Sequence, residues 1–322
     1  MGLFPPTKAP RLRVIVPCFN TKSTLKQLLG HLARLPDLAL SEVLVVDDGS
    51  SDGTARMIAE EYPSVQVVSG NGQLLWTGAI RKGMERALEE DAQFIFWLNH
   101  DCRPEPGAFN KVLEVLNNPQ VGVVSGWCRI AGYPDYPVNP GFKNFQPLQM
   151  DSTAGETVCA DGTNGNFVGF RADAVCKIGL PDAKHHPHYG DGPYTLRFSR
   201  AGFQVLICKA ARADLDYELE RRLPPFWRVA VSNRSVSWWL RYYFGSFKSQ
   251  YNLTYRWFDS LHLRGMFALL SYPKVELQVL IGILCGGIAR SKNGVETMRE
   301  RCLHRFRTRW PEEKLVLELK EL

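Results

Sequence analysis

Short apolar, β-branched runs alternate with longer segments of helical periodicity over the first two thirds of the chain. The runs are RVIVP at 13–17, EVLVV at 42–46, VQVV at 65–68, FIFWL at 94–98 and VGVV at 121–124. Such alternation is typical of βαβ units whose parallel strands are buried on both faces. It predicts an α/β fold with a doubly wound, mostly parallel sheet of the nucleotide-binding type.

The residues at the ends of three of these runs are candidates for ligand binding. They are Pro17, Phe19 and Asn20 at the first run, Asp47 and Asp48 at the second, and Asn99, His100 and Asp101 at the fourth. In open α/β sheets, ligands bind in the crevice beyond the carboxyl ends of the strands. We therefore expect these residues to converge on one crevice.

The chain lacks the glycine-rich loops with which many nucleotide enzymes bind phosphate groups. No GxGxxG follows the first run, and no GxxxxGK[ST] occurs. A metal bound by a carboxylate is the usual substitute, and Asp101 fits that role because it directly follows an apolar strand. The alternative role for this segment is to cap a helix that begins near Pro104 or Pro106.

Length and composition indicate a globular chain with two structural parts. The 322 residues exceed one typical domain, and 45% hydrophobic with 22% charged residues exclude disordered, collagen-like and coiled-coil chains. The eight cysteines include no CxxC pair, which predicts reduced core thiols. The first 13 residues contain no apolar run of the length that a signal peptide needs, so we expect a cytosolic site of action.

Positive charge and aromatic residues are concentrated in the last third of the chain. Residues 1–216 carry 21 Lys and Arg against 23 Asp and Glu, a net of −2, whereas residues 217–322 carry 18 against 10, a net of +8. Twelve aromatic residues lie between Phe226 and Phe258. This double shift predicts an α/β domain at 1–216 and a helical, basic and aromatic region at 217–322.

Five motifs follow one another along residues 12–210. They are VIVPCFN (14–20), VLVVDDGSSDGT (43–54), GNGQLLWTGAIRKGM (70–84), FWLNHD (96–101) and HYGDGPYTLRFSRAGF (188–203). Together they resemble the family 2 glycosyltransferases, particularly the branch that includes bacterial rhamnosyltransferases. The resemblance implies a GT-A fold with a helical C-terminal extension. It also implies an inverting, non-processive transfer of one sugar to an acceptor hydroxyl, in bacterial polysaccharide or glycolipid assembly.

The resemblance assigns the nucleotide part of the donor to residues of the first three motifs. Pro17, Phe19 and Asn20 would line the base pocket. One or both of Asp47 and Asp48 would bind the base or the ribose. The residues implied beside the nucleotide and its diphosphate are Trp76, Thr77, Gly78 and Arg81.

The same resemblance assigns metal binding and catalysis to the last two motifs and the segment between them. Asp101 would bind the metal, and Asn99 replaces the first carboxylate of the metal motif with an amide oxygen, which can ligate without adding charge. Asp191 would be the catalytic base. The segment 161–167, which contains Asn164, would approach the donor sugar or the acceptor.

Two further positions depart from the family pattern. Gly190 stands where an acidic residue often precedes the base, and Ile80 with Arg81 replaces a frequent asparagine. The implied cofactor is a divalent metal, Mn²⁺ or Mg²⁺. The implied partners are a UDP- or dTDP-sugar donor and a carbohydrate or lipid-linked acceptor. No nucleic acid is expected, because the basic excess lies outside the part of the chain that carries the ligand-type residues.

The segment HHPHYGD at 185–191 allows three interpretations. Pro187 and Gly190 favour a loop with solvated histidines. A single histidine, His188, could instead complete the shell of the catalytic metal, and the whole cluster could form a zinc site.

Two other classes of protein are alternatives to a glycosyltransferase. A nucleotidyltransferase that acts on sugar phosphates would share the sheet and the metal carboxylates, but it would need a glycine-rich, basic loop after the first strand, and VPCFNTKS is not one. A non-catalytic module that binds sugar or nucleic acid would use the basic, aromatic tail to contact phosphates and stack bases.

The C-terminal third also allows two interpretations, which are compatible with each other. From Trp227 to Phe258, Arg and Lys alternate with aromatic residues, which suits either a helical cap that packs on the sheet domain or a platform on an anionic membrane. Arg241, Lys248 and Arg256 would be the membrane-facing cations. The apolar stretch at 275–288 is shorter than the roughly twenty residues that span a bilayer, so no transmembrane helix is expected there.

Overall fold

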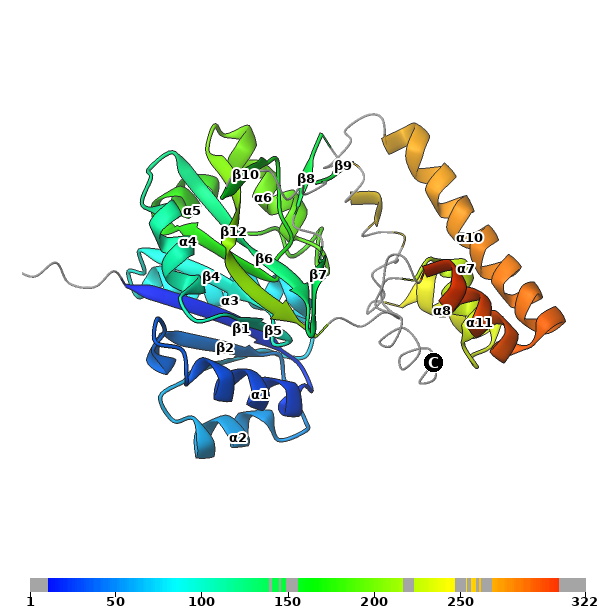
Figure 1. The fold of residues 1–322 in the computed structure, drawn as a ribbon, viewed down its shortest axis with the longest axis horizontal. Coiled ribbons are helices and arrows are strands. Elements are labelled where there is room, and N and C mark those ends of the chain that lie inside the picture. Colours follow the sequence, from blue (N-terminus) through cyan, green and yellow to red (C-terminus); the bar gives the residue numbers. More distant parts are fainter. Residues whose placement is uncertain are drawn as a thin grey trace, which may run out of the picture. The chain divides into compact units, whose positions relative to one another are not determined.

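The computed structural model describes residues 11–138, 141–144, 146–148, 156–216, 223–246, 253, 256–258, 261 and 268–306. The chain forms two compact units. The first consists of Met1–Arg129 with Pro137–Leu215, and the second consists of Ile130–Tyr136 with Asp216–Leu322 (Figure 1). The first unit contains the main sheet, and the second is helical over most of its described residues.

The sheet of the first unit has the strand order β10-β12-β6-β11-β4-β1-β2-β3. Parallel pairs join β1 to β2 and β4, and β2 to β3. These strands are β1 (Leu12–Cys18), β2 (Val43–Asp47), β3 (Gln66–Ser69) and β4 (Phe94–Leu98). Four of the five predicted strands therefore form the parallel part of an α/β sheet.

Antiparallel strands extend the sheet beyond β4. β11 (Phe167–Arg171) runs antiparallel to both β4 and β6, so the predicted strand at 121–124 is separated from the other parallel strands. The remaining strands of this sheet are β5 (Cys102–Pro104), β6 (Val121–Ile130), β7 (Tyr133–Pro137), β10 (Thr157–Ala160) and β12 (Gln204–Leu215). β8 (Phe142–Lys143) and β9 (Gln146–Pro147) form a separate antiparallel pair.

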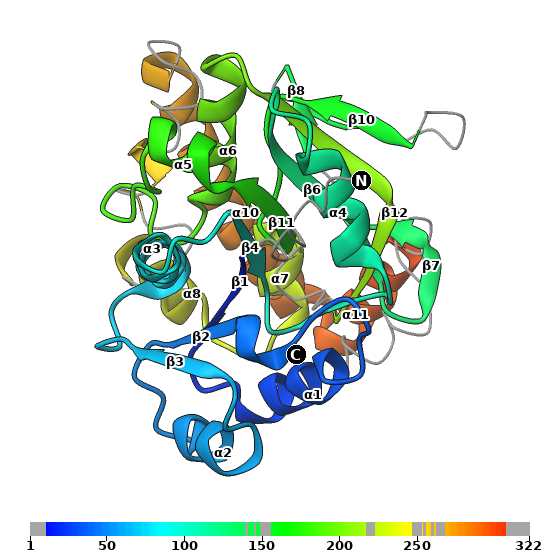
Figure 2. The same ribbon diagram turned by 90° about the vertical axis from the view of Figure 1, so that its left-hand side faces the viewer.

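Helices cover both faces of this sheet. They are α1 (Lys22–Leu32), the short 3-10 turn Leu40–Glu42, α2 (Thr54–Glu61), α3 (Leu75–Glu89), α4 (Ala108–Leu116), α5 (Ala172–Ile178) and α6 (Asp191–Arg200). In Figure 2, α3, α5 and α6 lie on one side of the central strands, and α1 and α4 lie on the other. This arrangement explains why the central strands are apolar on both faces.

An aromatic cluster packs α6 against the sheet. The ring of Trp97 on β4 lies 4.3 Å from that of Phe170 on β11 and 5.5 Å from that of Tyr194 on α6, measured between centroids. Phe198, one turn further along α6, completes the cluster, and all four side chains are buried. Burial of aromatic side chains contributes the largest apolar area per residue. The cluster thereby fixes the first residue of α6, Asp191, near the carboxyl end of β4.

The second unit has its own core. Its helices are α7 (Pro225–Val231), α8 (Val236–Gly245), α10 (Ala268–Asn293) and α11 (Val295–Phe306). Trp239 and Tyr243 are buried against Val229 and Ile283, and the indole of Trp239 donates to the hydroxyl of Ser232 at 2.9 Å. Part of the aromatic segment therefore stabilises the helical unit itself.

The expected length of the apolar helix in this unit is wrong. The stretch at 275–288 is the middle of α10, which has 26 residues, because the helix continues through Pro273 at one end and to Asn293 at the other. Within the described residues, Tyr272–Asn293 is long and apolar enough to cross a membrane, judged by length and composition alone.

The prediction that the cysteines are core thiols holds for part of the set. The eight cysteines are free. The buried ones are Cys18, Cys102, Cys128, Cys208 and Cys302. Cys159, Cys176 and Cys285 are exposed, because they lie on outward-facing positions of β10, α5 and α10.

Candidate active site

The loops after β1 and β2 are joined by hydrogen bonds around Ser50. Asn20, whose φ is +51°, donates its backbone N–H to the Ser50 hydroxyl at 2.9 Å and accepts from the Ser51 N–H at 2.8 Å. The Ser50 hydroxyl in turn donates to Asp47, whose Oδ1 also accepts the Ser50 N–H at 3.0 Å. Asp47 is 5% exposed. The two loops therefore form one rigid wall of the crevice.

Asp48 has a different role from Asp47. Its Oδ1 accepts the Gly72 N–H at 2.8 Å, and its Oδ2 accepts the Leu75 N–H at 3.1 Å. Leu75 is the first residue of α3 and has a φ of +55°. A carboxylate at a helix N-terminus is stabilised by the unpaired N–H groups and the helix dipole. Asp48 therefore fixes the start of α3.

Pro17 and Phe19, at the end of the first strand, differ in their exposure to solvent. Pro17 is buried in β1 opposite Val46, whereas Phe19 is 40% exposed. Cys18 lies between these two residues in the sequence. Burial and the neighbouring Asp47 carboxylate raise the pKa of its thiol far above the ordinary value. Cys18 is therefore a neutral thiol and not a nucleophile.

Trp76 connects α3 to the end of β4. Its indole N–H donates to Oδ1 of Asn99 at 2.8 Å, and the Asn99 amide donates to Oδ1 of Asn166 at 2.9 Å. The Trp76 ring packs edge-on against Trp97, with centroids 5.5 Å apart. A Cβ added at Gly165 would overlap the Trp76 ring, so only glycine allows this approach. The structure therefore brings Trp76 and Asn99 together.

Asp191 is held by two backbone N–H groups. Its Oδ2 accepts the Gly165 N–H at 2.8 Å, and its Oδ1 accepts the Gly192 N–H at 2.9 Å. Its carbonyl accepts the hydroxyl of Thr195, which also accepts the Thr163 N–H at 2.9 Å. The half-buried Asn164 lies in this same loop before β11.

Thr77 joins the start of α3 to the loop that precedes Asp191. Its N–H donates to the Pro187 carbonyl at 3.0 Å, and its buried hydroxyl accepts the Gly190 N–H at 3.1 Å. A Cβ added at Gly190 would overlap the Thr77 methyl and lie 2.7 Å from its hydroxyl oxygen. This contact leaves no room for a side chain at position 190.

Gly78 and Arg81 follow on the same helix. A Cβ at Gly78 would lie 3.2 Å from the Cβ of Leu74. Arg81 donates to Glu85 at 3.0 Å and to the Pro181 carbonyl at 3.1 Å. Its side chain is 44% exposed, so the ion pair with Glu85 is worth little and the guanidinium remains open to a further anionic partner.

The histidine segment forms a capped loop. The Asp182 carboxylate accepts the Lys184 and His185 N–H groups and lies 2.6 Å from Nδ1 of His185. Burial opposes ionisation of Asp182, but the hydrogen bonds from His185 outweigh it and lower the pKa of the carboxyl group. His186 is buried and His188 is half-buried.

The described residues contain no group of three or more His, Cys, Asp or Glu side chains placed to hold a metal ion. The three histidines and Asp191 are therefore not gathered into a zinc site, although all of them are described. Asp101 is half-buried and follows Asn99 by two residues, at the end of β4. A catalytic metal would need ligands from the substrate as well as from Asp101.

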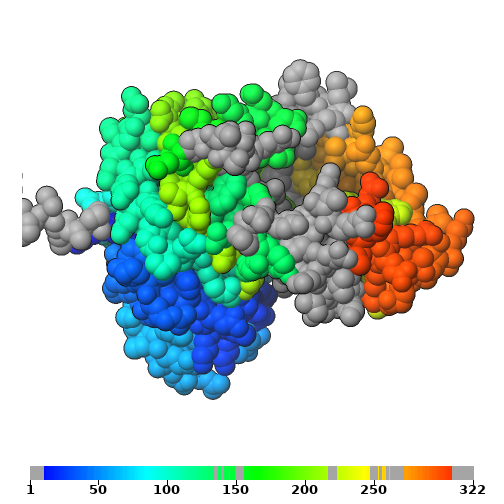
Figure 3. Space-filling view, in the orientation of Figure 1, coloured from blue at the N-terminus to red at the C-terminus, as the bar shows by residue number. Residues whose placement is uncertain are grey.

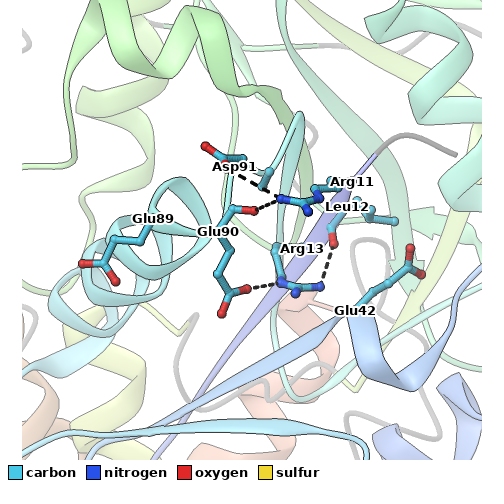
Figure 4. Close-up of a pocket in the computed structure, with 8 residues that line it drawn as sticks. Arg11, Leu12, Arg13, Glu42, Glu89, Glu90 and Asp91 are labelled. Carbon is cyan, nitrogen blue, oxygen red and sulfur yellow. Dashed lines mark hydrogen bonds and ion pairs between the residues drawn. The ribbon is translucent and has the colours of Figure 1, made fainter. Parts of the chain in front are cut away.

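A cavity of about 500 Å³ lies at the opposite edge of the sheet, at the amino end of β1. Arg13 donates there to Glu90 at 2.6 Å, and Arg11 lies 3.7 Å from Asp91 (Figure 4). Four acidic and two basic side chains line it, which disfavours an anionic ligand. Ligands of such sheets bind at the other edge, so this cavity is not the nucleotide site.

Some residues of the site are not apparent from the sequence. Ser50, Gly165 and Asn166 connect the predicted residues to one another, and they lie inside motifs whose more distinctive members attract attention first. The sequence offers one signal for them: serine and glycine residues lie within two positions of the predicted site residues Asp48 and Asn164.

The sheet, and the polar side chains beyond the carboxyl ends of β1, β2 and β4, define an α/β nucleotide-binding enzyme of the Rossmann-like type. The sequence model of the family "Glycosyl transferase family 2" matches residues 13–174. The chain belongs to this family and is a glycosyltransferase. The nucleotidyltransferase and the non-catalytic module are thereby set aside.

One sequence relative and one solved structure illustrate what the chain is similar to. Glycosyltransferase AglE of Haloferax volcanii is 27% identical over 218 residues, which cover 63% of this chain and 68% of AglE. The structure is similar to that of mannosyltransferase PcManGT from Pyrobaculum calidifontis in complex with GDP-Man and Mn²⁺, with a TM-score of 0.50, 15% identity, and coverage of 97% of this chain and 80% of that one.

The structure of GalNAc-T7 with UDP, GalNAc and Mn²⁺ is also similar. It gives a TM-score of 0.61 at 14% identity and covers 94% of this chain and 59% of that one. The GT-A fold is thus shown. Similarity to the rhamnosyltransferase branch stays a prediction.

The contact between Thr77 and Gly190 leads to a first prediction. Gly190 has a φ of −73°, so alanine there causes no strain in the backbone dihedral and acts mainly by displacing Thr77, with a lesser contact at 3.1 Å to the His186 carbonyl oxygen. We expect Gly190→Ala to lower the transfer rate at least about tenfold and to destabilise the fold by roughly 1–3 kcal/mol. Transfer assays and thermal unfolding would measure these effects.

Gly192→Ala is the matched control on the other side of Asp191. A Cβ there meets only Phe142, at an ordinary 3.5 Å. Equal effects of the two substitutions would show that Thr77 does not position the loop before Asp191.

Proposed function

We propose that the protein is an inverting, non-processive glycosyltransferase that moves one sugar from a nucleoside-diphosphate sugar to an acceptor hydroxyl. The observation that carries this proposal is the position of Asp191. Its carboxylate is fixed by two backbone N–H groups, beside the loop of Asn166 and the Trp76–Asn99 pair. It is thus a preorganised proton acceptor next to the expected nucleotide site.

The two backbone hydrogen bonds to Asp191 suit the role of a general base, because they orient its carboxylate. Oδ2 accepts the Gly165 N–H and Oδ1 accepts the Gly192 N–H, and these two bonds fix the orientation of the carboxylate toward an acceptor hydroxyl. Asp191 would take the hydroxyl proton while the acceptor oxygen attacks the anomeric carbon from the side opposite the leaving diphosphate. A single displacement of this kind inverts the anomeric configuration.

The base and ribose of the donor would bind along the wall formed by the β1 and β2 loops. Exposed Phe19 offers an aromatic face, Pro17 supports it from within β1, and Asn20 and Asp47 offer polar atoms. Asp48 would act on the donor through the loop that it fixes, because both of its oxygens already accept backbone N–H groups. A uridine or thymidine diphosphate sugar is the proposed donor.

The N-terminus of α3 is not an open phosphate cradle. The N–H groups of Leu75, Thr77 and Gly78 donate to Asp48, Pro187 and Leu74, respectively. The charge of the diphosphate therefore needs another partner. Arg81, one turn further along, is the proposed cationic side chain.

A divalent metal, Mn²⁺ or Mg²⁺, fits the donor set at the end of β4. Carboxylate, amide and imidazole donors suit Mn²⁺, and Mg²⁺ is commonly bound by one or two carboxylates together with substrate phosphates. Asp101 would hold the ion, with Asn99 and His188 as further candidate ligands. When bound, the ion would neutralise charge on the departing diphosphate. The Oδ1 atom of Asn99 accepts one hydrogen bond from the Trp76 indole, and its second lone pair could ligate the ion.

The proposed acceptor is a carbohydrate or a lipid-linked sugar, and the proposed location is the cytoplasm, with peripheral contact to the inner face of the membrane. Single-sugar addition is supported by the sequence, in which neither LTYRW at 253–257 nor FRTRW at 306–310 has the glutamine of the QxxRW motif of processive relatives.

Asp191→Asn tests the catalytic base. We expect transfer to fall by at least about a hundredfold, the lower end of the usual contribution of a general base, with donor binding within a few-fold of wild type. The measurements are product formation and nucleotide-sugar binding by calorimetry. Asp173→Asn, which removes a carboxylate from a surface ion pair with Arg171, is the control and should remain active. Substantial turnover by a folded Asp191→Asn enzyme would contradict the assignment.

Asp101→Ala tests the metal. We expect Mn²⁺ to strengthen binding of UDP, dTDP or GDP to the wild type by about tenfold or more, and this enhancement to vanish in the variant, because the carboxylate that would anchor the ion is gone. Binding is titrated with and without Mn²⁺, and transfer is measured with and without a chelator. Full transfer in the presence of chelator would show a metal-free reaction, with Arg81 as the phosphate partner.

A further inference from the structure

α10 has one face that packs closely within the second unit. A Cβ added at Gly286 would overlap the Phe226 carbonyl oxygen, and one added at Gly287 would overlap a methyl group of Val236. Gly282 approaches the Phe226 backbone at 3.3 Å in the same way. Ile283 and Val279 are buried beside Trp239 and Tyr243. The glycines thus let the backbones of α10 and α7 approach, and they fix which face of α10 is covered.

The other face carries an exposed apolar stripe. Leu277, Ile281, Leu284 and Ile288 are 56%, 50%, 43% and 55% exposed. Their spacing of four, three and four residues places them in one row along the helix, about 16 Å long. No charged residue lies between Leu277 and Ile288. Apart from exposed Gln278, the uncovered side of this part of α10 is largely apolar, which suits an apolar environment.

Cations lie at both ends of this stripe. Exposed Lys274 precedes it and exposed Lys292 follows it. The nearby acidic residue, Glu276, is only partly exposed and pairs with Arg256 at 3.2 Å. Residues 217–322 carry a net charge of +8 in total. An apolar row bounded by lysines is complementary to an anionic bilayer surface, in which acyl chains lie beneath negative headgroups.

We propose that α10 is a membrane-docking surface that lies in the interface of an anionic bilayer. Leu277, Ile281, Leu284 and Ile288 enter the acyl boundary, and Lys274 and Lys292 contact the headgroups. Figure 3 shows part of α10, in orange, at the surface of the second unit. This inference deepens the proposed function, since it names the surface at which a lipid-linked acceptor would be met.

Two other occupants of the stripe are less favoured. A second copy of the chain would need an interface of about 20 to 30 residues on each side, and the stripe offers four large apolar side chains. A helix that crosses the bilayer would need Ile283 and the glycine face to leave their partners on α7 and α8. Lying in the interface requires neither change.

The docking surface differs from the one that the aromatic pattern predicts. Trp239 and Tyr243 are core residues of the helical unit, and Arg256 is paired with Glu276. Lys248 lies outside the described residues. Arg241 is exposed and remains available as an additional cation.

The test uses the whole chain and vesicles, with no donor or acceptor present. A negative result would therefore count against membrane docking without bearing on the proposed sugar transfer. We expect co-sedimentation with vesicles of phosphatidylcholine mixed with phosphatidylglycerol at low salt, and weaker binding at high salt. Ile281→Gln with Leu284→Gln should lower the partition coefficient about tenfold or more. Lys274→Gln with Lys292→Gln should lower it several-fold on anionic vesicles only.

Val67→Gln is the matched control, because it removes an apolar side chain of 39% exposure from β3 of the first unit. It should leave vesicle binding unchanged. Thermal unfolding of the Ile281→Gln, Leu284→Gln protein should also match the wild type. A lower melting temperature would show that the stripe is covered by the chain itself, and a shift from dimer to monomer in sedimentation would show that a second copy covers it. Either result, or no binding to anionic vesicles at low salt, overturns the proposal.

Discussion

The carboxylate of Asp48 is the interaction on which the rest of the site depends. By accepting the N–H groups of Gly72 and Leu75, it fixes where α3 begins. The next two residues of that helix then contact separate parts of the crevice. Trp76 donates to Asn99 at the end of β4, and Thr77 contacts the loop that precedes Asp191. One buried carboxylate thus sets the relative positions of three parts of the crevice: the wall formed by the β1 and β2 loops, the end of β4, and the proposed base Asp191.

Glycines make this arrangement possible, because the backbone approaches a neighbouring side chain closely at three of them. Gly70 lies against Asp48, Gly165 against the Trp76 ring, and Gly190 against Thr77. At each position an added Cβ would come too close to a neighbouring side chain. Glycine is needed here because it has no side chain, and not because of the backbone dihedrals that it can adopt. At Gly190 the neighbour that excludes a side chain is Thr77, which lies on another helix.

The parallel half of the fold and the residues at its strand ends are predictable because burial on both faces leaves a continuous apolar run that ends at a polar residue. β1, β2 and β4 follow this rule, and so does the position of Asp48. The partners of Asp48 are not predictable, since they lie 24 and 27 residues further on and depend on how α3 packs. The same limit applies to α10, which extends beyond its apolar run at both ends and continues through Pro273.

The account is tested most directly by amide hydrogen exchange in Asp48→Asn, read by mass spectrometry. If Asp48 organises the site through α3, exchange should become faster together in residues 70–78, 162–167 and 187–192, while α4 at 108–116 stays as in the wild type. Faster exchange confined to residues 70–75, with the loops around Gly165 and Gly190 unchanged, would contradict the account.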